Sequence, residues 1–343
     1  MSDGKEGLVQ PMTTQVLICD DSAMARKQMA RVLPKDWDVS ITFAQNGMEG
    51  LEAIKAGKGE VVFLDLTMPV MDGFQVLKTV QKLDLPAMII VVSGDIQLKA
   101  YEKVKSLGAI DFIQKPISTE ALSHILQEYG IYNGNYNAQA NDAPMIKVDL
   151  RDACQEIANV AMGRAADLLA KLLDIYVPLP IPTVNVLEVS ELTMALKATE
   201  NDKQISALCQ GFIGAGVAGE ALLLFHDSSF DDMAKLMNIN HPDSSQAEIE
   251  VLIDTGNVLI GAFLNGISEQ MHMPFSQSHP VVLGRHCTAN ELIHDNAEKW
   301  QRTLAMEINY RIQDHNIQCD LLLLFTEDSL PTMTNKLSYL LES

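Results

Sequence analysis

Short apolar runs alternate with helix-like stretches along the first 128 residues. The apolar runs are rich in β-branched residues and nearly continuous, as in strands buried on both faces, and they read VLIC, VSITF, VVFLD, MIIVVS and AIDFI. Between them, apolar positions recur at helical spacing over residues 22–33, 47–56 and 96–107. This alternation predicts an α/β domain whose five-stranded parallel sheet is covered by helices on both faces.

Polar side chains stand where these strands end, and they are Asp20, Asp21, Asp65, Ser93 and Lys115. The carboxyl ends of parallel strands meet at one edge of a sheet, which is where ligands bind in such folds. Carboxylates brought this close repel one another unless a cation lies among them, and hard oxygen ligands suit Mg²⁺. The pattern predicts a carboxylate that can be phosphorylated beside Mg²⁺.

Residues 12–129 resemble the receiver domain of two-component response regulators, through the stretches ICDDS, LDLTMPVMDG, VVSGD and FIQKPI. The resemblance implies a flavodoxin-like, doubly wound fold. It implies that Asp65 accepts a phosphoryl group from a histidine kinase. It also implies that Asp21, Asp65 and the Thr67 carbonyl bind Mg²⁺, with help from Asp20. Ser93 and Lys115 are then expected to contact the phosphoryl oxygens. Finally, the resemblance implies that Phe112 is the switch aromatic and that the Lys115–Pro116 peptide is cis.

Composition changes after residue 128. Residues 1–128 carry 13 Lys+Arg against 17 Asp+Glu, whereas residues 129–343 carry 12 against 28, so their net charges are −4 and −16. Residues 130–145 are rich in Asn, Gly and Ala, as in a linker. The acidic second part repels phosphate backbones, which excludes nucleic acid as a partner. No apolar run approaches the roughly 18 residues that cross a bilayer, so we expect no membrane insertion and a cytoplasmic location.

The second part contains an internal repeat with an offset of 98 residues. DACQEIANVAMG begins at Asp152 and EVLIDTGNVLIG at Glu250, and each is followed by a proline, Pro182 or Pro280. Further on, ALLLFHDSS and DLLLLFTED, each an apolar strand followed by a helix-like segment, recur about 100 residues apart. We therefore expect an α+β domain over 146–343 with pseudo-twofold symmetry, made of halves at about 146–240 and 246–343.

On a helix, positions i, i+4, i+7 and i+11 share one face, so each copy places an acid and an amide on one stripe. The stripes hold Glu156 and Asn159 in the first copy, and Asp254 and Asn257 in the second, and we expect both to be exposed. The opposite faces are expected to be core, with Ile157, Val160, Leu168, Leu172, Val251, Val258 and Phe263. A helical glycine costs about 1 kcal/mol, so Gly163 and Gly261 predict close approach of another backbone or of an incoming surface.

An amide can hold a water in a defined orientation without being consumed, which suits hydrolysis of an activated phosphoryl group. The pattern D/S-x3-E-x2-N-x22-P over 146–343 resembles the CheC-type phosphatases of bacterial chemotaxis, which include CheC, CheX and FliY. The first copy fits throughout, whereas the second has Glu250 at the first position and the shorter Asp254 in place of Glu. The resemblance implies that Asn159 and Asn257 orient the hydrolytic water, and that Glu156 and Asp254 pair with the lysine of a docked receiver.

The sequence therefore predicts a phosphatase that hydrolyses the aspartyl phosphate of a phosphorylated chemotaxis response regulator and is regulated through its own receiver at Asp65. The attached receiver is a second possible substrate. An alternative is a phosphorylation-gated binding module that docks a receiver or a flagellar switch component without hydrolysis, and Asp254 favours it. A transcriptional regulator is disfavoured by the charge of −16 and by the lack of a helix-turn-helix pattern.

Overall fold

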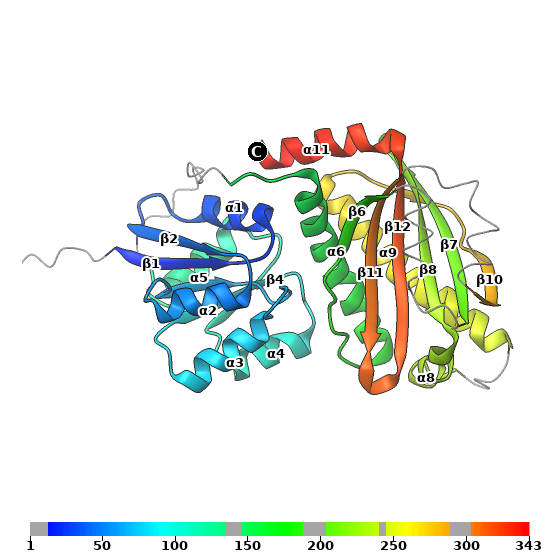
Figure 1. The fold of residues 1–343 in the computed structure, drawn as a ribbon, viewed down its shortest axis with the longest axis horizontal. Coiled ribbons are helices and arrows are strands. Elements are labelled where there is room, and N and C mark those ends of the chain that lie inside the picture. Colours follow the sequence, from blue (N-terminus) through cyan, green and yellow to red (C-terminus); the bar gives the residue numbers. More distant parts are fainter. Residues whose placement is uncertain are drawn as a thin grey trace, which may run out of the picture. The chain divides into compact units, whose positions relative to one another are not determined.

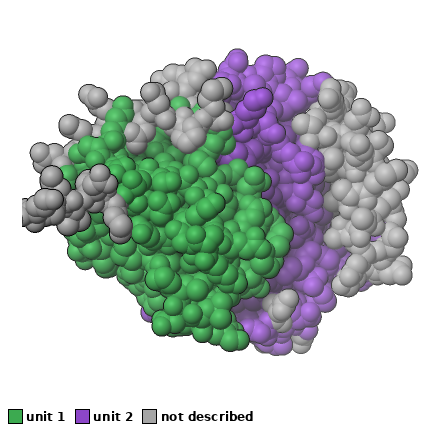
Figure 2. Space-filling model, turned by 60° about the vertical axis from the view of Figure 1, so that its left-hand side comes forward, with its two compact units in different colours: residues 1–21, 25–92, 104–146 green, residues 22–24, 93–103, 147–343 purple. Residues whose placement is uncertain are grey.

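The computed structural model describes residues 13–132, 134, 146–187, 204–239, 245–288 and 303–342 (Figure 1). The chain divides into two compact units, which Figure 2 colours separately. Unit 1 comprises Met1–Asp21, Ala25–Val92 and Val104–Ile146, and unit 2 comprises Ser22–Met24, Ser93–Lys103 and Lys147–Ser343. Of the predicted linker 130–145, residues 133 and 135–145 lie outside the described residues.

The N-terminal half contains the predicted five-stranded parallel sheet. Its strands lie in the order β2-β1-β3-β4-β5, and they are β1 (Thr14–Cys19), β2 (Val39–Ala44), β3 (Val61–Leu64), β4 (Met88–Ser93) and β5 (Asp111–Gln114). β1 pairs in parallel with β2 and β3, and β3 with β4. All four residues of β3 are buried, which is why its sequence is apolar without alternation.

Helices cover both faces of this sheet, and they are α1 (Ala23–Val32), α2 (Gly47–Lys55), α3 (Gly73–Leu83), α4 (Leu98–Ser106) and α5 (Thr119–Glu128). Apolar residues of α2 and α3 form the core on one face, and those of α1 and α5 form the core on the other. Local sequence fixes the helix starts. Asp72 forms a capping box with Gln75 at α3, and Asn46 and Ser118 cap α2 and α5.

Unit 2 is built on a second sheet in the order β10-β7-β8-β12-β11-β6, with β9 paired to β7. The strands are β6 (Thr183–Leu187), β7 (Ile205–Gly214), β8 (Val217–His226), β9 (Ser276–Gln277), β10 (Val281–Cys287), β11 (Thr303–Ile312) and β12 (Ile317–Thr326). The strand pairs of this sheet are antiparallel. This half is therefore a separate, sheet-rich region.

Two long helices, α6 (Leu150–Leu173) and α9 (Ser245–Met271), pack together over this sheet (Figure 1). Gly266 of α9 lies against Ala161 of α6, where a Cβ would come within 2.7 Å of the Ala161 Cα. The side chain of Gln270 donates to the Ile157 carbonyl at 3.0 Å. The shorter helices α8 (Phe230–Leu236) and α11 (Leu330–Glu342) follow 3₁₀ turns η1 (Asp227–Ser229) and η4 (Glu327–Ser329), and a third turn, η3 (Gln313–His315), joins β11 to β12.

The two halves of unit 2 present the same succession of elements: a long helix, strands that end in a hairpin, a 3₁₀ turn and a shorter helix. The turns make matching contacts across the β8–β12 pair. The Ser229 hydroxyl accepts from the Gln318 backbone N–H at 3.0 Å, and the Ser329 hydroxyl accepts from the Ala218 N–H at 2.9 Å. The outer strand of each half pairs with a strand of the other half, since β6 pairs with β11 and β10 pairs with β7.

One part of the predicted core is wrong. Leu168 and Leu172 of α6 are 46% and 39% exposed, whereas Leu169 and Leu173 are buried. The helix is buried on nearly all sides over residues 153–163. Because almost every residue in this stretch is buried, its apolar pattern does not show which face of α6 is buried in the last turns of the helix. Ile157, Val160, Val251 and Phe263 are buried as predicted, and Val258 is half-buried.

Candidate functional site

Three carboxylates meet at the ends of β1 and β3. Asp20, Asp21 and Asp65 each offer a carboxylate oxygen, and these oxygens lie within 4.8 Å of one another. Asp65 is 1% exposed and Asp21 is half-buried. The sheet therefore brings together the acids that the strand ends predicted. Their hard oxygen donors fit Mg²⁺, which would offset their mutual repulsion.

Lys115 supplies a positive charge to this cluster from the end of β5. Its Nζ lies 2.8 Å from Asp20 Oδ2 and 3.3 Å from Asp65 Oδ1, and the residue is 2% exposed. A buried ammonium is tolerated here because two carboxylates surround it. The Lys115–Pro116 peptide is cis, as predicted.

Hydrogen bonds that involve the backbone hold this acidic cluster in place. The Thr67 N–H donates to Asp65 Oδ2 at 2.9 Å. Arg26, which sequence reasoning missed, donates from one guanidinium nitrogen to the carbonyls of Asp20 and Asp21 at 2.6 and 3.0 Å. Its place one turn into the helix after the acidic pair is the signal that could have found it. Arg26 fixes the backbone of the pair rather than neutralising its side chains.

Two further predicted residues lie on the neighbouring strands. Ser93 ends β4 and is 1% exposed, and its hydroxyl accepts from the Asp95 N–H at 3.2 Å. Phe112 lies in β5, half-buried, against the core that α2 and α3 cover. Beneath the acids, burial raises the pKa of the Cys19 thiol, and the charges of Asp20 and Asp65 raise it further. Cys19 is therefore a protonated packing residue.

The polar stripe of α6 is not exposed, contrary to expectation. Glu156 and Asn159 are each 5% exposed. The amide oxygen of Asn159 is buried and has no hydrogen-bond partner within the described residues. Such an atom is costly to leave unsatisfied, so it calls for a ligand or a water.

Contacts within unit 2 account for part of this burial. The carboxylate of Asp152 accepts from the backbone N–H groups of Ala23 and Met24, both at 2.8 Å. The Gly94 carbonyl lies so close to Gly163 that a Cβ at 163 would overlap it. The predicted close approach of another backbone to this helical glycine is thus found.

Residues 93–103 are held in unit 2 by a second set of hydrogen bonds. The Gln97 side chain donates to the Val177 carbonyl at 2.8 Å and accepts from the Val177 N–H at 2.9 Å. Asp95 accepts from Gln97 at 3.0 Å and from the Tyr176 hydroxyl at 3.3 Å. Burial raises the pKa of Asp95, although these hydrogen bonds oppose the shift.

The stripe of α9 is exposed, as expected. Glu250, Asp254 and Asn257 all face solvent. A Cβ on Gly261 would meet nothing within 4 Å. On the inner face of the helix, Gly256 lies against Leu208 of β7. The two copies of the motif thus differ in their access to solvent.

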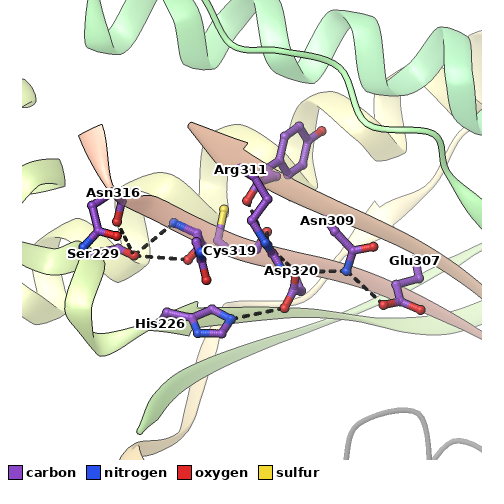
Figure 3. A network of polar contacts seen from close by, with 10 residues as sticks. His226, Ser229, Glu307, Asn309, Arg311, Asn316, Cys319 and Asp320 are labelled. Atoms are coloured by element: carbon purple, nitrogen blue, oxygen red, sulfur yellow. Dashed lines mark hydrogen bonds and ion pairs between the residues drawn. The ribbon is translucent and has the colours of Figure 1, made fainter. Parts of the chain in front are cut away.

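A buried polar network that sequence reasoning missed joins β8, β11 and β12 (Figure 3). The Asp320 carboxylate accepts hydrogen bonds from Arg311 at 2.7 Å and from the Asn309 amide at 3.0 Å. It also forms a hydrogen bond of 3.4 Å with His226 Nε2. Burial alone would raise the pKa of Asp320, but these hydrogen bonds outweigh it and lower the pKa. Serine hydrolases place a serine on the second histidine nitrogen, whereas His226 Nδ1 has no hydrogen-bond partner in the described part of the chain. The network is therefore not such a triad, and it ties three strands together.

By length and composition, one helix among the described residues, α9, is apolar enough to span a membrane. Its most apolar window has a mean hydropathy of 1.4, and 61% of that window is buried inside the protein. The core helix of a soluble protein meets the same criteria. The apolar faces of α9 pack in the core of unit 2.

Comparison with known proteins concerns the N-terminal half. Residues 16–127 match the family described as response regulator receiver domain. The chain is 40% identical over 115 residues to protein-glutamate methylesterase/protein-glutamine glutaminase 1 of Oleidesulfovibrio alaskensis, which is 32% of this chain and 30% of that protein. It is 34% identical over 131 residues to the corresponding protein of Methanococcoides burtonii, which is 36% of this chain and 37% of that protein. The chain thus spans about a third of the length of these relatives.

Among solved structures, the response regulator domain of Thermotoga maritima CheB is 28% identical, with a TM-score of 0.31. The match covers 35% of this chain and 99% of that chain. The family match, the parallel sheet of five strands and the acidic cluster with its lysine agree. Residues 16–127 of this chain therefore form a response regulator receiver domain.

Proposed function

We propose that this chain is a chemotaxis signalling protein in which residues 146–343 hydrolyse the aspartyl phosphate of phosphorylated receiver domains. One observation carries the proposal. An acid and an amide three residues apart, followed by a helical glycine, recur at corresponding places on α6 and α9, and the α9 copy faces solvent. A signalling role is supported by the match of residues 16–127 to the receiver family and by the similar stretch in protein-glutamate methylesterase/protein-glutamine glutaminase 1 of Oleidesulfovibrio alaskensis.

The receiver is proposed to take its phosphoryl group on Asp65 from a histidine kinase. Asp20, Asp21, Asp65 and the Thr67 carbonyl would hold Mg²⁺, which neutralises charge on the transferring group when it is bound. Lys115 is already between Asp20 and Asp65, so it can pair with a phosphoryl oxygen without a large movement. Ser93 would donate to another oxygen, and Phe112 would respond as the switch. We propose that this phosphorylation regulates the phosphatase half.

The chemistry proposed at α9 is attack by water on the phosphorus of a docked acyl phosphate. The Asn257 amide accepts from the water and orients it in line with the bond to the aspartyl oxygen. That P–O bond breaks, and the products are inorganic phosphate and a free carboxylate. Asp254, one turn earlier, would pair with the lysine of the docked receiver. Its shorter side chain requires the partner to come closer than a glutamate would.

The covered copy on α6 supports the same role for the amide. The buried Oδ1 of Asn159 has no hydrogen-bond partner among the described residues, so it can accept a hydrogen bond from a water. Glu156 lies one turn earlier on the same face. Both copies thus carry an acid and an amide on one helix face, as the proposed water activation requires, and the α9 copy is the one exposed to solvent.

A second candidate is the phosphorylation-gated binding module that docks a receiver or a flagellar switch component. It is favoured by Asp254 in place of glutamate and by the burial of Asn159. The two functions differ in one measurable respect: the phosphatase shortens the lifetime of a phosphorylated receiver, whereas the binding module leaves it unchanged or lengthens it.

The experiment follows the decay of a separate chemotaxis receiver phosphorylated with acetyl phosphate. Once the donor is removed, decay is measured with and without catalytic amounts of the full chain. Acceleration proportional to the amount of chain supports the phosphatase, and slower decay supports the binding module. The protein is proposed to work in the cytoplasm with a histidine kinase and a phosphorylated response regulator as partners, and without nucleic acid or membrane insertion.

A further inference from the structure

Unit 2 contains a cavity of about 530 Å³ that the proposed phosphatase chemistry does not use. Its walls come from three parts of the unit: residues 93–103, the segment between α6 and β6, and the end of β11 with the turn η3. Sites that hold small organic molecules have volumes of about 300 to 1,000 Å³. The cavity therefore suits a compact organic ligand, which is larger than a single ion.

Cationic side chains line this cavity, although the chain as a whole carries a net charge of −20. Lys99 lines it from α4, Arg311 from the end of β11, and His315 from η3. Among the described residues that line the cavity, Asp314 is the one acid, and it is exposed. A lining in which cations outnumber acids attracts a negatively charged ligand.

Arg311 keeps part of its guanidinium group available to such a ligand. One nitrogen, Nη1, makes the contact with Asp320 seen in Figure 3 and also donates to the Tyr310 carbonyl at 2.9 Å. Neither Nε nor Nη2 donates a hydrogen bond within the described part of the chain, and the side chain is 33% exposed. Because Asp320 holds the guanidinium in place, its remaining donors form a fixed fork that matches two oxygens of a phosphate.

Lys99 and His315 add further donors for an anion. The Lys99 side chain is exposed, and its ammonium donates to the Asp174 carbonyl at 3.4 Å. An ammonium has three N–H donors, so others remain for a ligand. His315 is half-buried, and its ring presents an N–H in either tautomer. The cavity thus gathers hydrogen-bond donors from three separate elements around one space.

The rest of the described lining, apart from Asp314, is aromatic or apolar, and it comprises Ile175, Tyr176, Pro178 and Ile312. Tyr176 is half-buried, and its hydroxyl is held by the hydrogen bond to Asp95 at 3.3 Å. The Lys103 ammonium lies 5.9 Å from the centre of the Tyr176 ring, which adds a positive charge near the cavity. A fixed aromatic ring beside apolar side chains packs against the non-polar part of a ligand. Inorganic phosphate would leave this wall in contact with water, whereas an organic phosphate would cover it.

We propose that this cavity binds a small organic phosphate, with its phosphate at Lys99, Arg311 and His315 and its organic part against Tyr176. A nucleoside monophosphate and a sugar phosphate share this chemistry. The ligand connects Lys99 to the end of β11, so its binding stabilises the packing of residues 93–103 in unit 2. The inference does not depend on the phosphatase activity, because neither α9 nor the stripe of α6 takes part in the site.

The test titrates the full chain with AMP, ribose 5-phosphate, inorganic phosphate and adenosine, and isothermal titration calorimetry measures binding. Mg²⁺ is left out, so that the carboxylates around Asp65 repel these anions and do not compete for them. The variants are Lys99→Ala and Arg311→Lys, and the control is Lys235→Ala, which removes an exposed lysine from α8. Arg311→Lys keeps a positive charge beside Asp320 but removes the fork of donors. Circular dichroism checks that each variant is folded.

We expect AMP and ribose 5-phosphate to bind with a Kd of about 1 mM or below, and AMP to bind more tightly because its base covers Tyr176. Inorganic phosphate should bind about tenfold more weakly than AMP, or worse, and adenosine should show no binding. Lys99→Ala and Arg311→Lys should each weaken AMP binding about tenfold, because each removes charge-assisted hydrogen bonds, while Lys235→Ala binds as wild type does. AMP should also slow hydrogen exchange over residues 98–103 of wild type.

Failure of both AMP and ribose 5-phosphate to bind at about 10 mM would overturn the inference. Unchanged affinity for AMP in both Lys99→Ala and Arg311→Lys would also overturn it, because the phosphate would then bind elsewhere. The same holds if adenosine or inorganic phosphate binds as tightly as AMP, since the phosphate or the organic part would then contribute nothing. Binding of ribose 5-phosphate without AMP supports the inference and identifies the ligand as a sugar phosphate.

Discussion

Gly163 and Gly261 stand at corresponding places on two helices that pack together, yet their surroundings are opposite. A Cβ on Gly163 would overlap the Gly94 carbonyl, whereas a Cβ on Gly261 would meet nothing within 4 Å. Helical glycine is unfavourable in both places, and only at 163 does a contact within the described residues require it. The open glycine therefore marks the helix face on which a partner remains to be identified.

The two glycines should respond differently to alanine. Gly261→Ala should stabilise the protein by up to about 1 kcal/mol, since alanine is the better helix former and the site is open. Gly163→Ala should destabilise it, or displace residues 93–103, because the new methyl overlaps a carbonyl. Urea midpoints measure the first effect, and hydrogen exchange over residues 93–103 measures the second. An equal change in the urea midpoint in the two variants would contradict the contact at Gly163.

His286 predicts a pH dependence of stability. Its hydrogen bond to Asp227 at 2.7 Å raises its pKa despite partial burial, and the charges of Asp227 and Glu248 add to the shift. A raised folded-state pKa gives stabilisation that is fully present below the unfolded value of about 6.5 and is lost as pH rises through the folded value. Unfolding midpoints of wild type should thus fall as the pH rises above about 6.5. The fall should be small because the ring is 41% exposed, and it should be reduced in His286→Gln.

The buried carboxylate of Asp320 should contribute more to stability than His286 does. Asp320→Ala leaves Arg311 and His226 without their buried carboxylate and should cost about 2 to 3 kcal/mol. Since the pKa of Asp320 is lowered in the folded state, its stabilisation is present above the unfolded value and is lost as pH falls through the folded value. The difference between wild type and Asp320→Asn should therefore shrink below about pH 3.9. Denaturant titrations at neutral and acid pH measure the free energy of unfolding of both proteins. A difference between them that does not change with pH would contradict the stabilising role of the ionised Asp320.

The receiver site predicts uptake of one phosphoryl group at Asp65. Asp65→Asn should abolish labelling by acetyl phosphate, because the carboxylate oxygen that forms the acyl phosphate is gone. Chelation of Mg²⁺ should abolish labelling of wild type as well. Asp84→Asn is the matched control, since Asp84 is exposed and lies in left-handed backbone that asparagine tolerates. Phosphate-affinity electrophoresis reads the outcome, and labelling that persists in Asp65→Asn would place the acceptor elsewhere.

Much of the receiver could be predicted from the sequence because its signals are local. Each strand is an apolar run, and each site residue follows the end of a strand, so Asp20, Asp65 and Lys115 meet once the strands lie in parallel. Arg26 escaped notice because it lies within an amphipathic helix, where an arginine usually faces solvent. Its contact with two carbonyls depends on how the preceding turn is folded.

The second half was harder to predict because its decisive contacts join distant residues. The repeat in the sequence indicated two halves, but not that β6 and β10 each pair within the opposite half. Burial of Glu156 and Asn159 was likewise missed, since residues more than 50 positions away in the sequence contact their helix. The buried network around Asp320 comes from three strands, and nothing in the spacing of its members indicates it.

The central claim is that the exposed amide of Asn257 directs water at the aspartyl phosphate of a separate receiver. The most direct measurement is the rate of phosphate release from that receiver in the presence of wild type, Asn257→Ala, and the control Asn265→Ala, which removes another exposed amide two turns further along α9. We predict that Asn257→Ala lowers kcat at least a hundredfold, in line with the loss of a water-positioning group, while Asn265→Ala keeps the wild-type rate. A wild-type rate in Asn257→Ala would contradict the account.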